Sequence, residues 1–170
     1  MTGLTFQPDV VVEPFNRADL RVLFPLMRLA EPEIELSRWT AFATKLARRR
    51  DGRAGILVAR RRGHRFPCGV VCYRQFEDLR FGTILLAEHL VAADPIAPQT
   101  VLQAMAVELE RLGRDLGCGA VRVLSPDGRA TIELRRAGHE GAGIVLVKSL
   151  PLDDVVRLST IRAQADMHVS

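Results

Sequence analysis

The chain has 170 residues, of which 48% are hydrophobic and 26% charged, and its formal net charge is +4. This length and composition predict one domain over residues 1–170, with a core at about 9–150 and a tail at 151–170. No apolar run reaches the roughly 20 residues of a membrane span, and no secretory signal begins the sequence, so a cytoplasmic location is expected.

The first third of the chain reads as a short strand followed by two helices. A β-rich run at residues 9–13 is followed by Asn16, which is placed to cap a helical turn, with Asp19 three residues on. Apolar residues at helical spacing then predict a helix that kinks or restarts at Pro25, and a second helix at 33–50. The inner face of that second helix is predicted to carry Leu36, Trp39, Ala43 and Leu46.

The remaining sequence changes to the pattern of strands, interrupted by two helices. Runs of β-branched and apolar residues predict further strands at residues 55–61, 67–76, 81–92, 120–124 and 144–149. A long amphipathic helix is predicted at 101–116, with Leu109 in its apolar stripe and Gly117 at its end, and a short helix at 129–136. This order predicts a mixed α/β (α+β) domain, in which helices flank a central mixed β-sheet.

The cysteines and the clustered arginines each have a structural interpretation and a functional one. Cys68, Cys72 and Cys118 are spaced neither for a disulfide nor for a zinc site, so free thiols and no bound metal are expected. Arginines gather at residues 48–65, where they could contact nucleic acid, an anionic membrane surface or an acidic cofactor. A solvated helix end and turn is the favoured interpretation, and the absence of interleaved aromatic residues further weakens binding of single-stranded nucleic acid.

The strand, loop and helix at residues 85–118 have the layout of a phosphate-binding loop, yet the loop at 94–100 contains two prolines and no glycine. An anion at a helix N-terminus needs free backbone N–H groups and the positive end of the helix dipole. The amides predicted to supply them belong to Gln99, Thr100, Val101, Leu102 and Gln103. Thr100 is also placed to cap the helix, which would occupy one of these amides. The sequence therefore predicts an impaired phosphate cradle.

The element order and three segments resemble the GNAT superfamily of acyl-CoA-dependent N-acyltransferases over about residues 10–150. The segments are the strand, loop and helix at 85–118, the stretch DGRATIELRRAGHE at 127–140 and the run GIVLVKSL at 143–150. The resemblance implies a GNAT-like fold, with acetyl-CoA or another acyl-CoA as co-substrate and no metal. It further implies an amine on a small molecule or a peptide as the acceptor, and it allows a homodimer.

The chain departs from the family pattern at several positions. The glycines of the family loop fall on Thr100 and Leu102, and its glutamine or arginine falls on Ala97. In the next motif the family's asparagine becomes Asp127, and its tyrosine acid becomes Leu134. These departures favour a second hypothesis, in which the chain is a catalytically inactive GNAT-like module that binds a ligand or a protein.

If the chain is an enzyme, the resemblance also implies roles for particular residues. The pantetheine arm and the rest of the cofactor would contact Leu90, Val91, Ala92 and Asp127, besides the loop amides. Glu88, or a water, would deprotonate an amine that attacks the thioester directly. A solvated or paired structural carboxylate is the alternative role of Glu88. His89 is expected to point to the opposite face of the strand from Glu88.

Overall fold

The computed structural model describes residues 9–49, 51–124, 132, 134–136 and 138–139. The chain divides into two units, residues 1–139 and 140–170, and every described residue belongs to the first. The strand predicted at 144–149 and the predicted cofactor contact at Asp127 lie outside the described residues, as does half of the helix predicted at 129–136.

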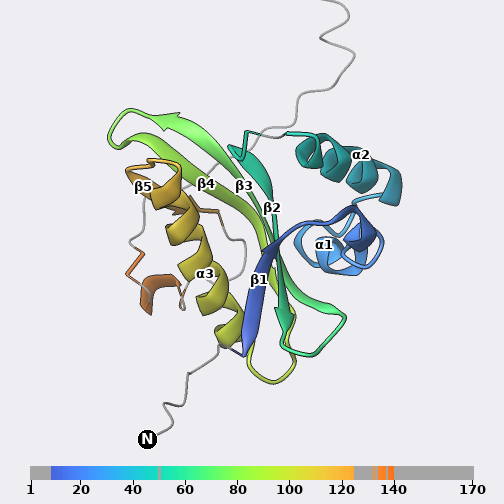
Figure 1. The fold of residues 1–170 in the computed structure, drawn as a ribbon. Coiled ribbons are helices and arrows are strands. Elements are labelled where there is room, and N and C mark those ends of the chain that lie inside the picture. The colour runs from blue at the N-terminus through green and yellow to red at the C-terminus, as the bar shows by residue number, and fades with distance from the viewer. Residues whose placement is uncertain (1–8, 50, 125–131, 133, 137, 140–170) are drawn as a thin grey trace, which may run out of the picture. The chain divides into compact units, whose positions relative to one another are not determined.

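Five strands form one mixed sheet in the order β1-β2-β3-β4-β5 (Figure 1). They are β1 (Val10–Pro14), β2 (Ala54–Arg61), β3 (Pro67–Asp78), β4 (Gly82–Ala92) and β5 (Ala120–Val123). The first four strands pair antiparallel with their neighbours, and β5 runs parallel to β4. Because a parallel pair needs a crossover, the long helix between β4 and β5 lies across one face of the sheet. The predicted mixed sheet with flanking helices is confirmed.

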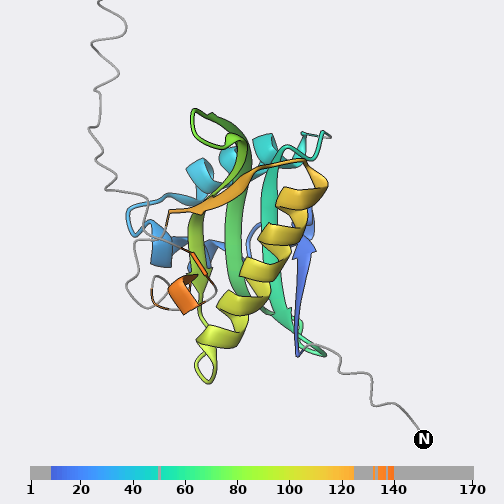
Figure 2. The same ribbon diagram turned by 90° about the vertical axis from the view of Figure 1, so that its left-hand side faces the viewer.

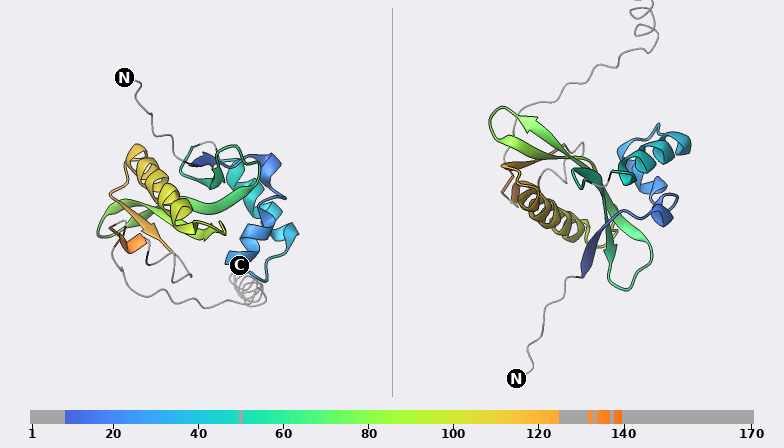
Figure 3. Two further views of the ribbon diagram at one scale, coloured as in Figure 1. Left: turned by 90° about the horizontal axis from the view of Figure 1, so that it is seen from below. Right: turned by 45° about the horizontal axis from the view of Figure 1, so that its top comes forward.

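Helices cover both faces of this sheet. Helix α3 (Pro98–Asp115) packs on one face, and α1 (Phe24–Ala30) and α2 (Leu36–Ala47) pack on the other (Figures 2 and 3). A short 3-10 helix, η1 (Arg17–Asp19), precedes α1 and is capped by Asn16 as predicted. Pro25 stands in the first turn of α1, so a new helix starts there, as the apolar spacing predicted.

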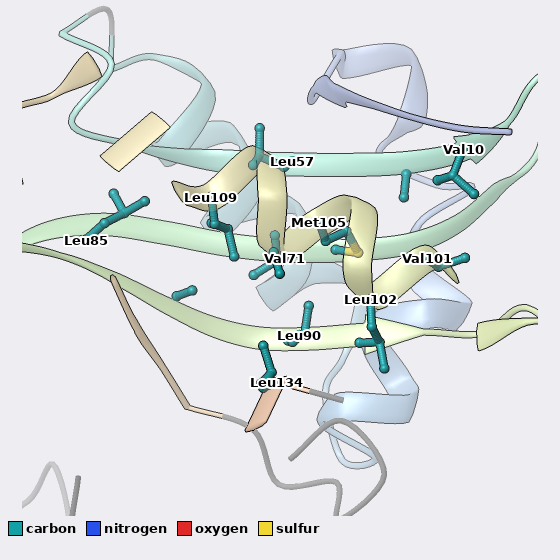
Figure 4. Packing of buried hydrophobic residues seen from close by; sticks show 13 residues of the cluster. Val10, Leu57, Val71, Leu85, Leu90, Val101, Leu102, Met105, Leu109 and Leu134 are labelled. Carbon is teal, nitrogen blue, oxygen red and sulfur yellow. The ribbon is translucent and has the colours of Figure 1, made fainter. Parts of the chain in front are cut away.

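Each face has its own hydrophobic core. Between α3 and the sheet, Val101, Met105 and Leu109 are almost completely buried (Figure 4). Under α1 and α2, Trp39 is fully buried, and its indole Nε1–H donates to the carbonyl oxygen of Leu20 at 2.7 Å. The inner-face prediction for α2 holds for Trp39 and Ala43, and for Leu46, which is partly buried and packs against the same cluster. It is wrong for Leu36, which begins the helix and is 41% exposed.

Glycine ends α3 in the way its position predicted. Gly117 has φ +69°, a conformation that L side chains rarely adopt. Its N–H donates to the carbonyl of Arg114 at 3.0 Å, and the N–H of Cys118 donates to that of Gly113 at 2.8 Å. These two bonds form a Schellman motif, which satisfies the last carbonyls of the helix and turns the chain towards β5.

Gly69 on β3 lies directly under α3, and a methyl group there is expected to destabilise the fold. A Cβ at this position would lie 2.7 Å from Val101 Cγ1 and 2.9 Å from Met105 Sδ. Gly69→Ala should therefore lower the free energy of unfolding by about 1–3 kcal/mol through overpacking, measured by urea denaturation. Val101→Ala should relieve part of the clash, so the double variant should lose less than the sum of the single ones. Strict additivity would contradict this account.

Candidate functional site

Strand β4 runs on past the last residue that pairs with β5. The register of the two strands ends at Ala87 and Val123, where the N–H of Leu124 donates to the carbonyl of Ala87 at 2.8 Å. β4 continues to Ala92, and the described part of the chain provides no partner on that side beyond Leu124. Among the described residues, β4 therefore has an open edge beyond Ala87 on the side that faces β5.

The backbone of β4 presents alternate residues to this open edge. The N–H of Ala93 donates to Cys68 on β3 at 2.8 Å, so the groups of Ala92 and Leu90 point away from β3. Val91 instead pairs with Val70 of β3, and its side chain is buried under α1 and α2. Of the three strand residues proposed to contact a cofactor, Leu90 and Ala92 have the backbone orientation for it.

A β-bulge interrupts β4 just before the open edge. Val70 pairs with Val91 and Cys72 with Glu88, so two steps along β3 correspond to three along β4. The extra residue is His89, whose φ of 54° is the one positive value among the described non-glycine residues. The bulge shifts the alternation of side chains between the two faces of the sheet.

The bulge makes the expectation that His89 and Glu88 face opposite sides wrong. Glu88 lies opposite Cys72, a member of the core under α1 and α2. His89 contacts the same side: its Nδ1 is 3.2 Å from Glu31 Oε1, and its ring packs edge-on against Phe42 of α2. Strict alternation fails because the inserted residue takes a left-handed conformation, which turns its side chain towards the helices.

Glu88 is both close to the open edge and engaged in an ion pair. Its Oε2 lies 3.2 Å from Nε of Arg74, which is half exposed. Burial, and then the charge of Glu88, raise the pKa of the Cys72 thiol to about 12. An exposed pair of this kind contributes little stability. The geometry thus gives Glu88 the paired structural role offered as its alternative, and the catalytic role stays a prediction.

Helix α3 begins three residues earlier than predicted. Its first residue is Pro98 and its N-cap is Ala97, whose side chain makes no capping bond. The prediction that Thr100 caps the helix is wrong, because Thr100 lies inside the first turn and its N–H donates to the carbonyl of Ala97 at 3.0 Å. Proline is favoured at the first helical position, where its missing N–H costs nothing.

The early start leaves few amides for a phosphate. The N–H groups of Val101, Leu102 and Gln103 point along the helix towards carbonyls four residues earlier. Pro98 has no N–H, so within the first turn the amide of Gln99 stays available. The side chain of Leu102 points into the core rather than across the loop (Figure 4). The cradle is therefore smaller than the sequence predicted.

Asp94 lies in the loop that precedes the helix. Its role in this loop was not predicted from the sequence. Its Oδ1 accepts from the N–H of Ile96 at 2.9 Å and of Ala97 at 2.8 Å, and its Oδ2 lies 2.5 Å from Nε of Arg61. At 6% exposure it is the one buried charged residue among those described. The Arg61 guanidinium, and then the Ala97 amide, hold the pKa of the carboxyl far below its usual range. Asp-Pro at the start of a turn was the available signal.

Two of the clustered arginines are engaged in ion pairs at this end of the sheet. Arg60 lies 2.5 Å from Asp19 and 3.5 Å from Glu13. Arg61 pairs with Asp9 as well as with Asp94. These contacts favour the structural interpretation of the cluster over a nucleic-acid surface.

Further features of the described residues bear on the chemistry of the site. Leu134, where the family pattern has its tyrosine, is buried in the same cluster as Leu90 (Figure 4) and supplies no acid. Cys68, Cys72 and Cys118 are free thiols. Within the described ranges, no group of three or more His, Cys, Asp or Glu side chains could hold a metal ion. No helix there is long and apolar enough to cross a membrane.

Comparison with solved structures identifies the fold. An aminoglycoside N-acetyltransferase, AAC(6')-Iy, in complex with CoA aligns with a TM-score of 0.68 and 14% identity over 83% of this chain and 94% of that one. Glucosamine-6-phosphate N-acetyltransferase from Arabidopsis thaliana aligns with a TM-score of 0.62 and 12% identity over 84% of this chain and 99% of that one. A GNAT family acetyltransferase from Staphylococcus aureus aligns with a TM-score of 0.62 and 14% identity over 84% of this chain and 99% of that one. No family model and no curated protein matches the sequence. The chain has the fold of the GNAT acetyltransferases.

Proposed function

We propose that the protein is an N-acyltransferase that takes its acyl group from acetyl-CoA or another acyl-CoA. The observation that carries this proposal is the open edge of β4, where the backbone of Leu90 and Ala92 faces away from β3. Such an edge can pair with the amides of a pantetheine arm as it would with another strand. The acceptor would be a small-molecule or peptide amine. The similar solved structures named for aminoglycosides and glucosamine-6-phosphate support a small-molecule amine.

The proposed reaction is a direct transfer. The amine nitrogen attacks the thioester carbonyl, the new C–N bond forms, the C–S bond breaks, and the CoA thiol leaves. Its rate depends on holding amine and thioester in line and on a base that removes the ammonium proton. Glu88 or a water is the base suggested by the sequence. Asp127 as a further cofactor contact, a cytoplasmic location and a homodimer remain predictions.

A non-catalytic GNAT-like module is the second candidate, and the loop before α3 favours it. The Asp94 carboxylate already accepts from two loop amides and adds a negative charge where a pyrophosphate would lie. Together with the single remaining amide of the first helical turn, this arrangement predicts weak binding of the nucleotide part of CoA.

Calorimetric titration with acetyl-CoA and with acetylpantetheine tests the proposal. We expect weak but measurable binding of both, with less than about a tenfold gain from the nucleotide, because the strand edge holds the shared arm. Ala92→Pro removes the N–H that faces the open edge and leaves the pairing with β3 in place. It should weaken acetyl-CoA binding about tenfold, whereas Ala92→Val, which keeps the N–H, should not. No binding to the wild type at millimolar ligand would leave only the non-catalytic module.

A further inference from the structure

His89 is held in a costly backbone conformation at the point where β4 loses its partner. A φ of 54° in a non-glycine residue is strained and persists only where surrounding contacts enforce it. Such outliers gather at active sites. The bulge directly precedes Leu90 and Ala92, the residues proposed to hold the pantetheine arm, so His89 lies at the end of that arm where the thioester would be.

The side chain of His89 is oriented by two neighbours. Glu31, the C-cap of α1, places Oε1 3.2 Å from Nδ1, and Phe42 of α2 packs edge-on at a ring separation of 6.2 Å. A carboxylate at Nδ1 fixes the proton of the neutral ring on that nitrogen, which leaves the lone pair on Nε2. The side chain remains 31% exposed, so the ring is only partly covered by its neighbours.

Glu88 is less suited to take a proton, since its carboxylate is committed to Arg74 at 3.2 Å. Arg74 is a permanent cation, so one carboxylate oxygen of Glu88 stays engaged in an ion pair. Histidine, in contrast, is the side chain that most often serves as general base in enzymes. We propose that His89, positioned by Glu31, is the general base of the acyl transfer, an inference that rests on the proposed function.

Nε2 of neutral His89 accepts a proton from the ammonium group or from the nitrogen of the tetrahedral intermediate. The nitrogen lone pair forms the C–N bond, the C–S bond breaks, and the sulfur leaves as thiolate. The proton held on His89 then passes to solvent or to the thiolate, which regenerates the neutral ring. Glu31 stabilises the imidazolium in between and is a positioning residue.

His89→Asn tests the base without removing the bulge, because asparagine tolerates positive φ and can still bond to Glu31. Release of the CoA thiol from acetyl-CoA would be followed with a panel of primary amines. We expect kcat to fall about 10²–10⁴-fold, while KM for acetyl-CoA stays within about threefold. His64→Asn, the same substitution at an exposed histidine in the turn between β2 and β3, should retain kcat within about threefold. A wild-type kcat in His89→Asn, or a loss of kcat in Glu88→Gln larger than that in His89→Asn, would overturn the inference.

The ring itself gives a readout that does not depend on turnover. Nitrogen-15 NMR of the neutral histidine should show His89 protonated on Nδ1, and Glu31→Ala should abolish this preference. A ring protonated on Nε2 in the wild type overturns the role, because no lone pair would then face the amine. Calorimetry separates a failure of the general-base role from a failure of the proposed function. His89→Asn should bind acetyl-CoA as the wild type does. Absence of binding or of thiol release in the wild type overturns the proposed function and this inference together.

Discussion

Replacing Leu109 with alanine is expected to lower the free energy of unfolding by about 2–5 kcal/mol. Leu109 lies in the middle of α3, is 1% exposed and belongs to the cluster that joins the helix to the sheet (Figure 4). Removing its three outer carbons deletes buried apolar surface and leaves a cavity. The cavity persists because α3 already packs closely on Gly69, so the helix cannot move inwards to fill it.

The measurement is urea denaturation of the variant beside a matched control on the same helix. Val107 is 63% exposed, two residues from Leu109, and Val107→Ala should change the free energy of unfolding by less than about 0.5 kcal/mol. A loss below about 1 kcal/mol in Leu109→Ala would mean that the α3 face of the sheet is not the main core.

The order of strands and helices was predictable because periodicity records which faces are buried. The apolar stripe of α3 follows directly from packing against one face of the sheet. The continuous apolar runs of β2 to β4 follow from the cores on both faces. The capping signals also held: Asn16 caps η1, and Gly117 ends α3 in a left-handed conformation. Each of these depends on residues a few positions apart, which a single sequence displays.

The bulge at His89 could not be predicted from the same pattern. Alternation of side chains describes a regular strand, and an inserted residue leaves no mark in composition or spacing. Glu88 and His89 were therefore assigned to opposite faces. The contact with Glu31 depends on a helix 58 residues away in sequence, which local reasoning does not bring into view.

The loop before α3 shows a different limit. The sequence pattern predicts a loop at Pro98 and Gln99 and a cap at Thr100, although proline begins many helices. Asp94 shapes this loop, because its carboxylate accepts hydrogen bonds from two backbone amides just before the helix. The same carboxylate forms an ion pair with Arg61 at the end of β2. A long-range ion pair of this kind follows from the arrangement of strands in space.

Asp94→Asn is expected to destabilise the protein at neutral pH and to remove part of its sensitivity to acid. The fold lowers the pKa of this carboxyl below its ordinary value near 4. A depressed pKa contributes stability that is present above pH about 4 and is lost as the pH falls further, towards the value in the fold. The variant lacks this contribution, so its melting temperature should lie below that of the wild type at pH 7.

The deficit should shrink as the pH falls from about 4 towards 2, which thermal unfolding across this range would show. Asp9→Asn is the matched control, since Asp9 also pairs with Arg61 but is mostly exposed. It should cost little, and its effect should depend little on pH. A constant deficit for Asp94→Asn from pH 7 to below 3 would contradict the role assigned to its charge.

The same variant is expected to bind CoA more tightly than the wild type, by about tenfold in the dissociation constant. The asparagine oxygen can still accept from Ile96 and Ala97, so the loop keeps its shape. The negative charge next to the helix N-terminus disappears, and Arg61 loses one of its two carboxylates and becomes available to a phosphate. Calorimetry with CoA and with pantetheine distinguishes a gain at the phosphates from a change in binding at the strand edge. Only CoA, which carries the phosphates, should bind more tightly. Equal affinity of variant and wild type for CoA would mean that Asp94 does not limit the cradle, and that the few remaining amides alone set the affinity.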